Sequence, residues 1–104
     1  MRPLSKSNLP NSLNDFIADL PDWQVSADSK VLSREFIFPD FKSAFQFMSL
    51  CANLAEELNH HPDWSNSWNR VAVSLTTHSA NALTQLDLTM AKAMDQFSKD
   101  VLAG

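Results

Sequence analysis

Two spacings of apolar residues divide this chain into expected helices and strands. Spacings of three and four are typical of a helix with one buried face, and alternation is typical of a half-buried strand. A short helix that ends at Pro21 is predicted over 11–20 from the apolar residues Leu13, Phe16, Ile17 and Leu20. Residues 1–10 contain two prolines and several small polar residues, which favours a loose arm.

Residues that favour strands form four runs, which pair into two predicted hairpins. The runs 23–25 and 31–38 flank a polar segment and predict the first hairpin. The runs 64–68 and 71–77 predict the second, about a tight turn at 69–70. Apolar and polar residues alternate in the last run, where Val71, Val73 and Leu75 are interleaved with Ala72, Ser74 and Thr76.

The two longest helical patterns lie between the hairpins and at the end of the chain. Pro39 and Asp40 open the first, which runs to about Leu58. Its expected apolar stripe is Phe41, Ala44, Phe45, Met48, Cys51, Ala52, Ala55 and Leu58. Thr84 and Asp87 have the spacing of a capping box at the start of the second helix. Its expected inward face is Leu83, Leu86, Met90, Met94, Phe97 and Val101.

The order of these elements is α-β-β-α-β-β-α, which predicts an α+β fold. Two hairpins make a four-stranded antiparallel sheet, and three amphipathic helices cover one of its faces. The length of 104 residues fits a single domain over 1–104. Open sheet edges invite pairing, and the apolar last helix carries more hydrophobic surface than so small a domain can cover. We therefore expect a homodimer or a homotetramer.

Composition excludes several classes of function. Eight basic and 12 acidic residues give a net charge of −4, and no basic stripe is present, which argues against nucleic-acid binding. The only glycine is Gly104, so glycine-rich nucleotide loops are excluded. There is no long apolar run and no signal-peptide pattern, which favours a soluble cytoplasmic protein without a membrane segment. The single cysteine, Cys51, lies in a helical pattern and is expected to be a buried thiol.

The three histidines of the chain lie within 19 residues, at His60, His61 and His78. Histidine titrates near neutral pH and is the usual residue for moving protons in catalysis. Pro62 disfavours a helical conformation in the residue before it, so the adjacent pair is expected at a corner between a helix and a strand. His78 is expected where the last strand ends. A cleft at this corner is therefore the candidate site.

The spacing of these residues resembles the signature of the pterin-4a-carbinolamine dehydratases. The pattern consists of Glu56, His60, His61, Pro62, Trp68, His78 and Asp87, and weaker similarity extends from about Trp23 to the last helix. The resemblance implies an α+β sandwich that removes water from a 4a-hydroxytetrahydropterin without a cofactor or a metal. It also implies a dimer or tetramer and a pathway link to aromatic amino-acid hydroxylases.

The resemblance also implies roles for individual residues. His61 and His78 are the expected proton-transfer pair, and His60 is a second contributor or an orienting group. Trp23 is the expected wall of the pterin pocket. The other residues expected to bind substrate are Glu56, Pro62, Ser74, Thr76, Thr77 and Asp87. Asn59 stands where better-known members have an acid, so that acid cannot tune the histidine pair here.

Each of these residues also has a purely structural interpretation. The histidine pair can interact with the carbonyl groups at a helix end, and His78 can be an ordinary loop residue. Glu56 can be a solvated helix residue. Asp87, as the third residue of a helix, can stabilise the free N–H groups there, and this role is compatible with one in the site.

Two other functions compete with a dehydratase. The family's fold also acts as a dimerisation cofactor for a transcription factor, so the chain can be a non-catalytic pterin-binding or interaction module. Three imidazoles can also bind zinc. Adjacent histidines diverge on an extended chain, which weakens the zinc hypothesis. The complete set of histidines favours the enzyme.

Overall fold

The computed structural model describes residues 17–104. Its elements are β1 (Gln24–Val25), β2 (Leu32–Ile37), α2 (Phe41–Leu58), β3 (Asp63–Ser67), β4 (Arg70–Leu75) and α3 (Gln85–Ala103). The described residues thus contain two of the three predicted helices. The predicted helix over 11–20 lies, apart from its last residues, outside the described part of the chain.

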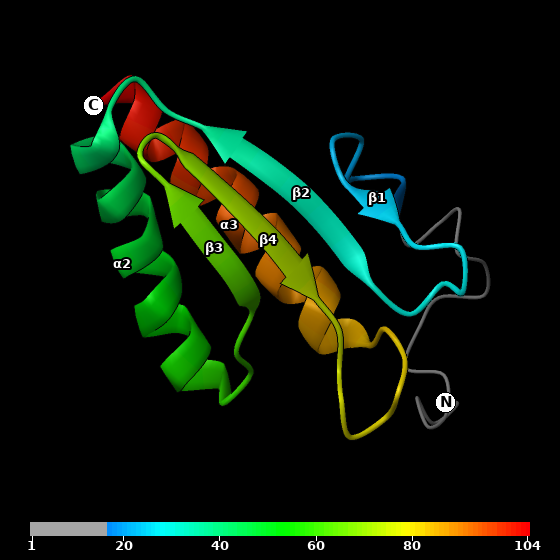
Figure 1. The fold of residues 1–104 in the computed structure, drawn as a ribbon. Coiled ribbons are helices and arrows are strands. Elements are labelled where there is room, and N and C mark those ends of the chain that lie inside the picture. The colour runs from blue at the N-terminus through cyan, green and yellow to red at the C-terminus, as the bar shows by residue number, and fades with distance from the viewer. Residues whose placement is uncertain (1–16) are drawn as a thin grey trace.

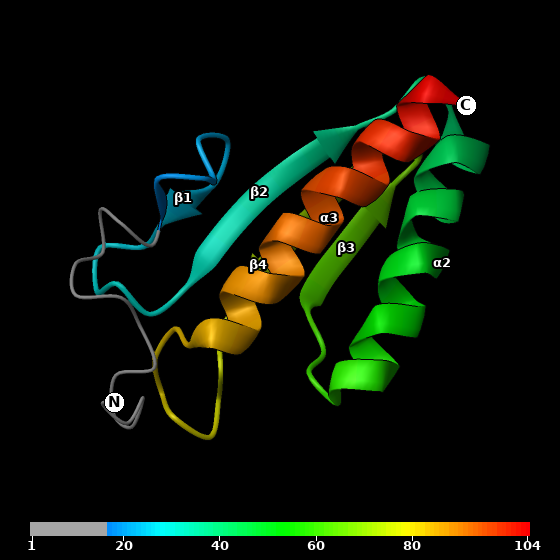
Figure 2. The same ribbon diagram turned by 180° about the vertical axis from the view of Figure 1, so that it is seen from behind.

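The four strands form one antiparallel sheet, as predicted. Their order in the sheet, which the sequence analysis did not give, is β1-β2-β4-β3. Both helices lie against the same face of this sheet (Figures 1 and 2). Residues that point toward the helices are buried, as the paired Leu32 and Leu75 illustrate. The neighbouring pair, Ser33 and Ser74, belongs to the opposite set of side chains, as alternation along a strand requires. The fold class is therefore α+β.

The second hairpin turns one residue earlier than predicted. Trp68 and Asn69 form the turn, and Arg70 is the first residue of β4 rather than a turn residue. Trp68 has a left-handed backbone with a φ of 51°. The Asn66 side-chain amide stabilises this turn by donating to the carbonyl groups of Trp68 and Arg70. The sequence pattern missed the position because tryptophan rarely adopts a positive φ.

The helix α2 begins at an N-cap, as predicted. The Asp40 carboxylate accepts a hydrogen bond from the Ser43 backbone N–H at 2.8 Å, and this bond lowers the pKa of Asp40. The predicted apolar stripe is wrong in part, because Phe47 is completely buried while Phe41 and Phe45 are 46% and 56% exposed. The Phe47 ring packs against Phe36 and Phe38, with centroids 4.6 and 5.1 Å apart.

Most of the apolar face of helix α3 is buried within the domain. Met90, Met94 and Val101 are buried, and Phe97 packs against the core. The prediction of surplus hydrophobic surface at Met90, Met94, Phe97 and Val101 is therefore wrong. Large exposed apolar side chains are found on α3 at Leu86 and Leu102, and on other elements at Ile37, Phe41, Phe45 and Trp68.

The thiol of Cys51 lies in the core, and burial raises its pKa to about 12. A thiol with a raised pKa holds its proton at neutral pH, and only the thiolate is nucleophilic. We expect a disulfide reagent to modify native protein much more slowly than protein unfolded in denaturant. Absorbance of the thiolate that the reagent releases measures the modification rate in the native and in the unfolded state. Equal rates in the two states would contradict the buried position of Cys51.

Candidate functional site

The two adjacent histidines follow directly after a capped helix end. Asn59 ends α2 with a left-handed φ of 51°, and its N–H is directed at the last carbonyl groups of the helix. The N–H of His60 donates to the Ala55 carbonyl oxygen at 3.0 Å, which completes the C-terminal cap. Residues 60–62 then connect to β3. The histidine pair therefore lies at the predicted corner between a helix and a strand.

His60 is the buried member of the pair, and its ring contacts the carboxylate of Asp87. His60 Nε2 lies 2.6 Å from Asp87 Oδ1, and Asp87 is 0% exposed. The other carboxylate oxygen accepts hydrogen bonds from the Thr77 hydroxyl at 2.8 Å and from the Thr84 N–H at 2.9 Å. The predicted capping box is confirmed, with Thr84 as the N-cap of α3. Asp87 thus caps a helix and contacts a histidine at the same time.

The other two histidines are exposed and have their own acidic partners. His61 Nε2 lies 2.6 Å from Glu56 Oε2, one turn back on α2. His78 Nε2 lies 3.7 Å from Asp63 Oδ2, at the start of β3. Their side chains are 55% and 77% exposed. Every imidazole in the chain therefore faces a different carboxylate.

One cavity of about 290 Å³ brings the three histidines together. Its lining consists of Asn59, His60, His61, Thr76, Thr77, His78, Ser79 and Leu86. These residues come from the end of α2, the segment after β4 and the first turn of α3. The volume is close to the lower end of the range for small-molecule pockets. Three imidazoles around one open cavity can donate and accept protons on a bound ligand.

Other residues predicted for the site are divided between this cavity and other regions. Thr76 and Thr77 line it, and Asp87 lies behind it against His60. Glu56 reaches it through His61, and Pro62 lies in the connection that follows.

Trp23 is a core residue of this chain. Its ring packs edge-on against Phe36, with centroids 5.8 Å apart, and its indole N–H donates to Asp95 at 2.8 Å. It is 5% exposed and does not belong to the lining of the histidine cavity. The structure does not bring Trp23 to this cavity, and its expected contact with a pterin stays a prediction.

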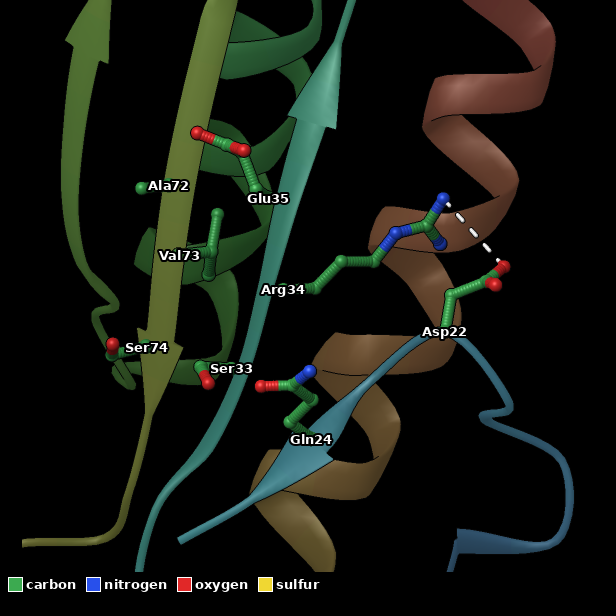
Figure 3. Close-up of a pocket in the computed structure, with 8 residues that line it drawn as sticks. All are labelled: Asp22, Gln24, Ser33, Arg34, Glu35, Ala72, Val73 and Ser74. Atoms are coloured by element: carbon green, nitrogen blue, oxygen red, sulfur yellow. Dashed lines mark ion pairs between the residues drawn. The ribbon is translucent and has the colours of Figure 1, made fainter.

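Ser74 lines a different and larger hollow, of about 380 Å³, over β2 and β4 (Figure 3). Arg34 extends from this hollow toward Asp22 and makes a 2.6 Å ion pair with Asp95 of α3. The lining contains no imidazole, and its one guanidinium already has acidic partners. Size alone favours this hollow, but the groups that can transfer protons lie in the smaller cavity, which we take as the site.

Ser79 and Leu86 line the cavity and were not predicted as parts of the site. Ser79 lies in the turn closed by the Thr77–Ala82 bridge, directly after His78. That position was the only available signal for Ser79. Leu86 had been assigned to the inward face of α3, but it is partly exposed and borders the cavity.

Within residues 17–104, no group of three histidine, cysteine or acidic side chains is arranged to hold a metal ion. In the same residues, no helix is long and apolar enough to cross a bilayer.

Known proteins of one family are similar to this chain. The profile of the family described as Pterin 4 alpha carbinolamine dehydratase matches residues 2–97. A Rhizorhabdus wittichii protein, provisionally named a pterin-4-alpha-carbinolamine dehydratase, is 46% identical over 82% of this chain and 88% of its own. A Bordetella avium protein with the same provisional name is 43% identical over 89% of this chain and 86% of its own.

Two solved structures share the fold. A transcriptional coactivator/pterin dehydratase from Brucella melitensis superposes with a TM-score of 0.82 at 43% identity, over 86% of this chain and 97% of that one. A pterin dehydratase-like protein identified as a RuBisCO assembly factor in the alpha-carboxysome gives a TM-score of 0.65 at 20% identity, over 74% and 89%. The second likeness concerns the fold alone.

Proposed function

The chain belongs to the pterin-4a-carbinolamine dehydratase family, and we propose that it removes water from a 4a-hydroxytetrahydropterin. The observation that carries this proposal is the single cavity bordered by three imidazoles, each with its own carboxylate partner. Family membership supports a pterin as the substrate class. The histidines supply the groups that such a dehydration needs.

The reaction requires one base and one acid. A base takes the proton from N5 of the pterin, and the N5 electron pair forms the double bond to C4a. The C4a–O bond breaks as an acid donates a proton to the departing hydroxyl, which leaves as water. The products are the quinonoid dihydropterin and water, with no change in oxidation state. Imidazoles can perform both transfers near neutral pH.

We assign the proton transfers to His61 and His78, the two histidines of the cavity lining with exposed rings. Glu56 orients His61 through the 2.6 Å contact, and Asp63 is within reach of His78. His60 is held from behind by Asp87 and contributes a fixed polar group to the substrate. A His60, His61 and His78 zinc site receives less support, because each ring faces a separate acid.

The polar edge of the pterin can bind at the segment after β4, where Thr76 and Thr77 line the cavity. The Thr76 hydroxyl already donates to the Lys30 carbonyl at 2.6 Å, and the Thr77 hydroxyl donates to Asp87. Each hydroxyl oxygen can still accept a hydrogen bond from the ligand, whereas the Thr77 backbone is engaged in its bridge with Ala82. Ser74 lines the other hollow, so nothing in the histidine cavity supports its predicted role in binding substrate.

Stopped-flow absorbance of a 4a-hydroxytetrahydropterin, generated in situ, tests the proposal directly. We expect purified protein treated with a chelator to accelerate the decay to the quinonoid product. Activity that is lost on chelation and restored by zinc would favour the metal hypothesis. In a cell, such an activity would recycle the pterin cofactor of an aromatic amino-acid hydroxylase in the cytoplasm.

The exposed apolar side chains favour assembly of the chain with copies of itself. Five of the six belong to elements that meet at one end of the molecule: the end of β2, the start of α2, the β3–β4 turn and the end of α3 (Figures 1 and 2). The rings of Phe41 and Phe45 stack there, with centroids 5.8 Å apart. Contiguous exposed apolar surface is typical of interaction sites. The same end also supports the alternative function, an interaction module.

We expect a homodimer or homotetramer in solution, because association would cover this apolar end. Light scattering behind a sizing column measures the mass at micromolar concentration. A monomeric mass at every accessible concentration would reject the assembly and leave the proposed dehydration standing.

A further inference from the structure

A chain of buried hydrogen bonds connects the N-terminal cap of α3 with the ring of His60. The oxygen atoms of Thr77 and Thr84 lie 2.7 Å apart, and both side chains are buried. The Thr77 hydroxyl also contacts Asp87 Oδ2 at 2.8 Å, and Asp87 Oδ1 contacts His60 Nε2. The chain therefore runs from Thr84 through Thr77 and Asp87 to the imidazole.

The direction of each hydrogen bond follows from the number of available protons. The Thr77 hydroxyl has a single proton, which it donates to Asp87. In the contact between the two threonines, Thr84 must therefore be the donor. Thr84 Oγ1 in turn accepts from the Leu86 backbone N–H at 3.2 Å. All the bonds thus point toward the Asp87 carboxylate, an arrangement in which neighbouring bonds strengthen one another.

The same count fixes the protonation of the His60 ring. An ionised carboxylate only accepts hydrogen bonds, so His60 Nε2 must donate its proton to Asp87 Oδ1. In the neutral ring, Nδ1 then has no proton and presents a lone pair. Nδ1 has no hydrogen-bond partner among the described residues, and His60 lines the cavity.

We infer that Thr77 and Thr84 are positioning residues, which hold Asp87 so that His60 keeps its proton on Nε2 and offers Nδ1 to the substrate as an acceptor. Thr77 is well placed for this role because it also closes the turn that carries His78, through its bridge to Ala82. The helix cap, the His78 turn and the His60 ring are thereby built on one hydrogen-bonded cluster. The effect on turnover rests on the proposed dehydration, whereas the protonation state of His60 does not.

Long-range ¹H–¹⁵N correlation spectra of ¹⁵N-labelled protein measure the protonated nitrogen of each ring, at a pH where all three rings are neutral. We expect His60 of the native chain to carry its proton on Nε2. Asp87→Asn should move this proton to Nδ1. The two donors at Oδ2 require the amide oxygen there, so the NH₂ group faces His60 Nε2, which must then accept.

Substitution of Thr77 tests the hydroxyl chain without changing the carboxylate. Thr77→Val keeps the shape of the side chain but removes the donor to Asp87 Oδ2, so the carboxylate can turn away from His60. We therefore expect a mixed protonation of His60 and a roughly tenfold loss of kcat with a smaller change in KM. Thr77→Ser should restore both. Thr89→Val is the matched control, because Thr89 is an exposed threonine of α3 outside the cluster.

Three results would overturn the inference. They are a native His60 with its proton on Nδ1, an Asp87→Asn variant with unchanged His60 protonation, and a Thr77→Val variant as active as Thr89→Val. The expected protonation in a folded protein without dehydratase activity would refute the proposed function and support the positioning cluster.

Discussion

Removing either exposed imidazole is expected to lower kcat by about 10²–10⁴-fold, the range for a general acid or base. The variants His61→Ala and His78→Ala each remove one of the two proposed proton-transfer groups from the histidine cavity. Their KM should change little, because the lost interaction acts in the transition state rather than in ground-state binding. Stopped-flow measurement of 4a-hydroxytetrahydropterin decay at several substrate concentrations separates kcat from KM.

Two further variants separate the loss of an imidazole from a change elsewhere in the fold and from the loss of a neighbouring acid. Gln96→Ala changes an exposed residue of α3 outside the cavity and should keep native turnover. Asp63→Asn removes only the acid that lies 3.7 Å from His78, and both groups are well exposed. Its effect should therefore be small, since exposed ion pairs contribute little. Near-native kcat in both histidine variants would remove them from the proton-transfer role.

Local signals in the sequence predicted much of the fold. Asp40 and the pair Thr84 and Asp87 predicted where the two described helices begin, because capping depends on a few adjacent residues. The two hairpin patterns predicted the antiparallel sheet, with strand ends correct to within two residues. The β3–β4 turn was displaced because hydrogen bonds from Asn66 stabilise an unusual tryptophan conformation.

Less of the candidate site than of the fold could be predicted from the sequence. The order of residues predicted that His60 and His61 lie at a corner, since Pro62 follows them. It could not predict which ring is buried, because that depends on Asp87, 27 residues away, and on the turn that carries Thr77. The sequence predicts which residues of one helix or strand share a face. It does not predict contacts between elements, because these depend on how the strands are paired and how the helices pack on them.

The choice of buried phenylalanine on α2 shows the same limit. Two sets of apolar residues on this helix have helical spacing, one containing Phe41 and Phe45 and the other containing Phe47. Helical periodicity is consistent with either set forming the buried face. Packing against Phe36 and Phe38 determines that Phe47 is on the buried side. The residue that the sequence pattern overlooked is therefore the largest fully buried side chain among residues 17–104.

Phe47→Ala is expected to lower the free energy of unfolding by about 3–5 kcal/mol, the usual cost of removing a buried ring. Phe47 is completely buried, so its loss leaves a cavity among the rings of Phe36 and Phe38. Small domains are stable by roughly 5–15 kcal/mol, so this loss is a large share of the total. Urea unfolding, followed by circular dichroism at one low protein concentration, measures it.

Phe45→Ala is the matched control, two residues away on the same helix. Phe45 is more than half exposed, and alanine favours a helix more than phenylalanine does, so stability should stay within about 0.5 kcal/mol. Any part of its effect that grows with protein concentration reports on assembly rather than on the core. If Phe45→Ala destabilised the dilute protein as much as Phe47→Ala, the buried face of α2 would be the one that the sequence pattern first indicated.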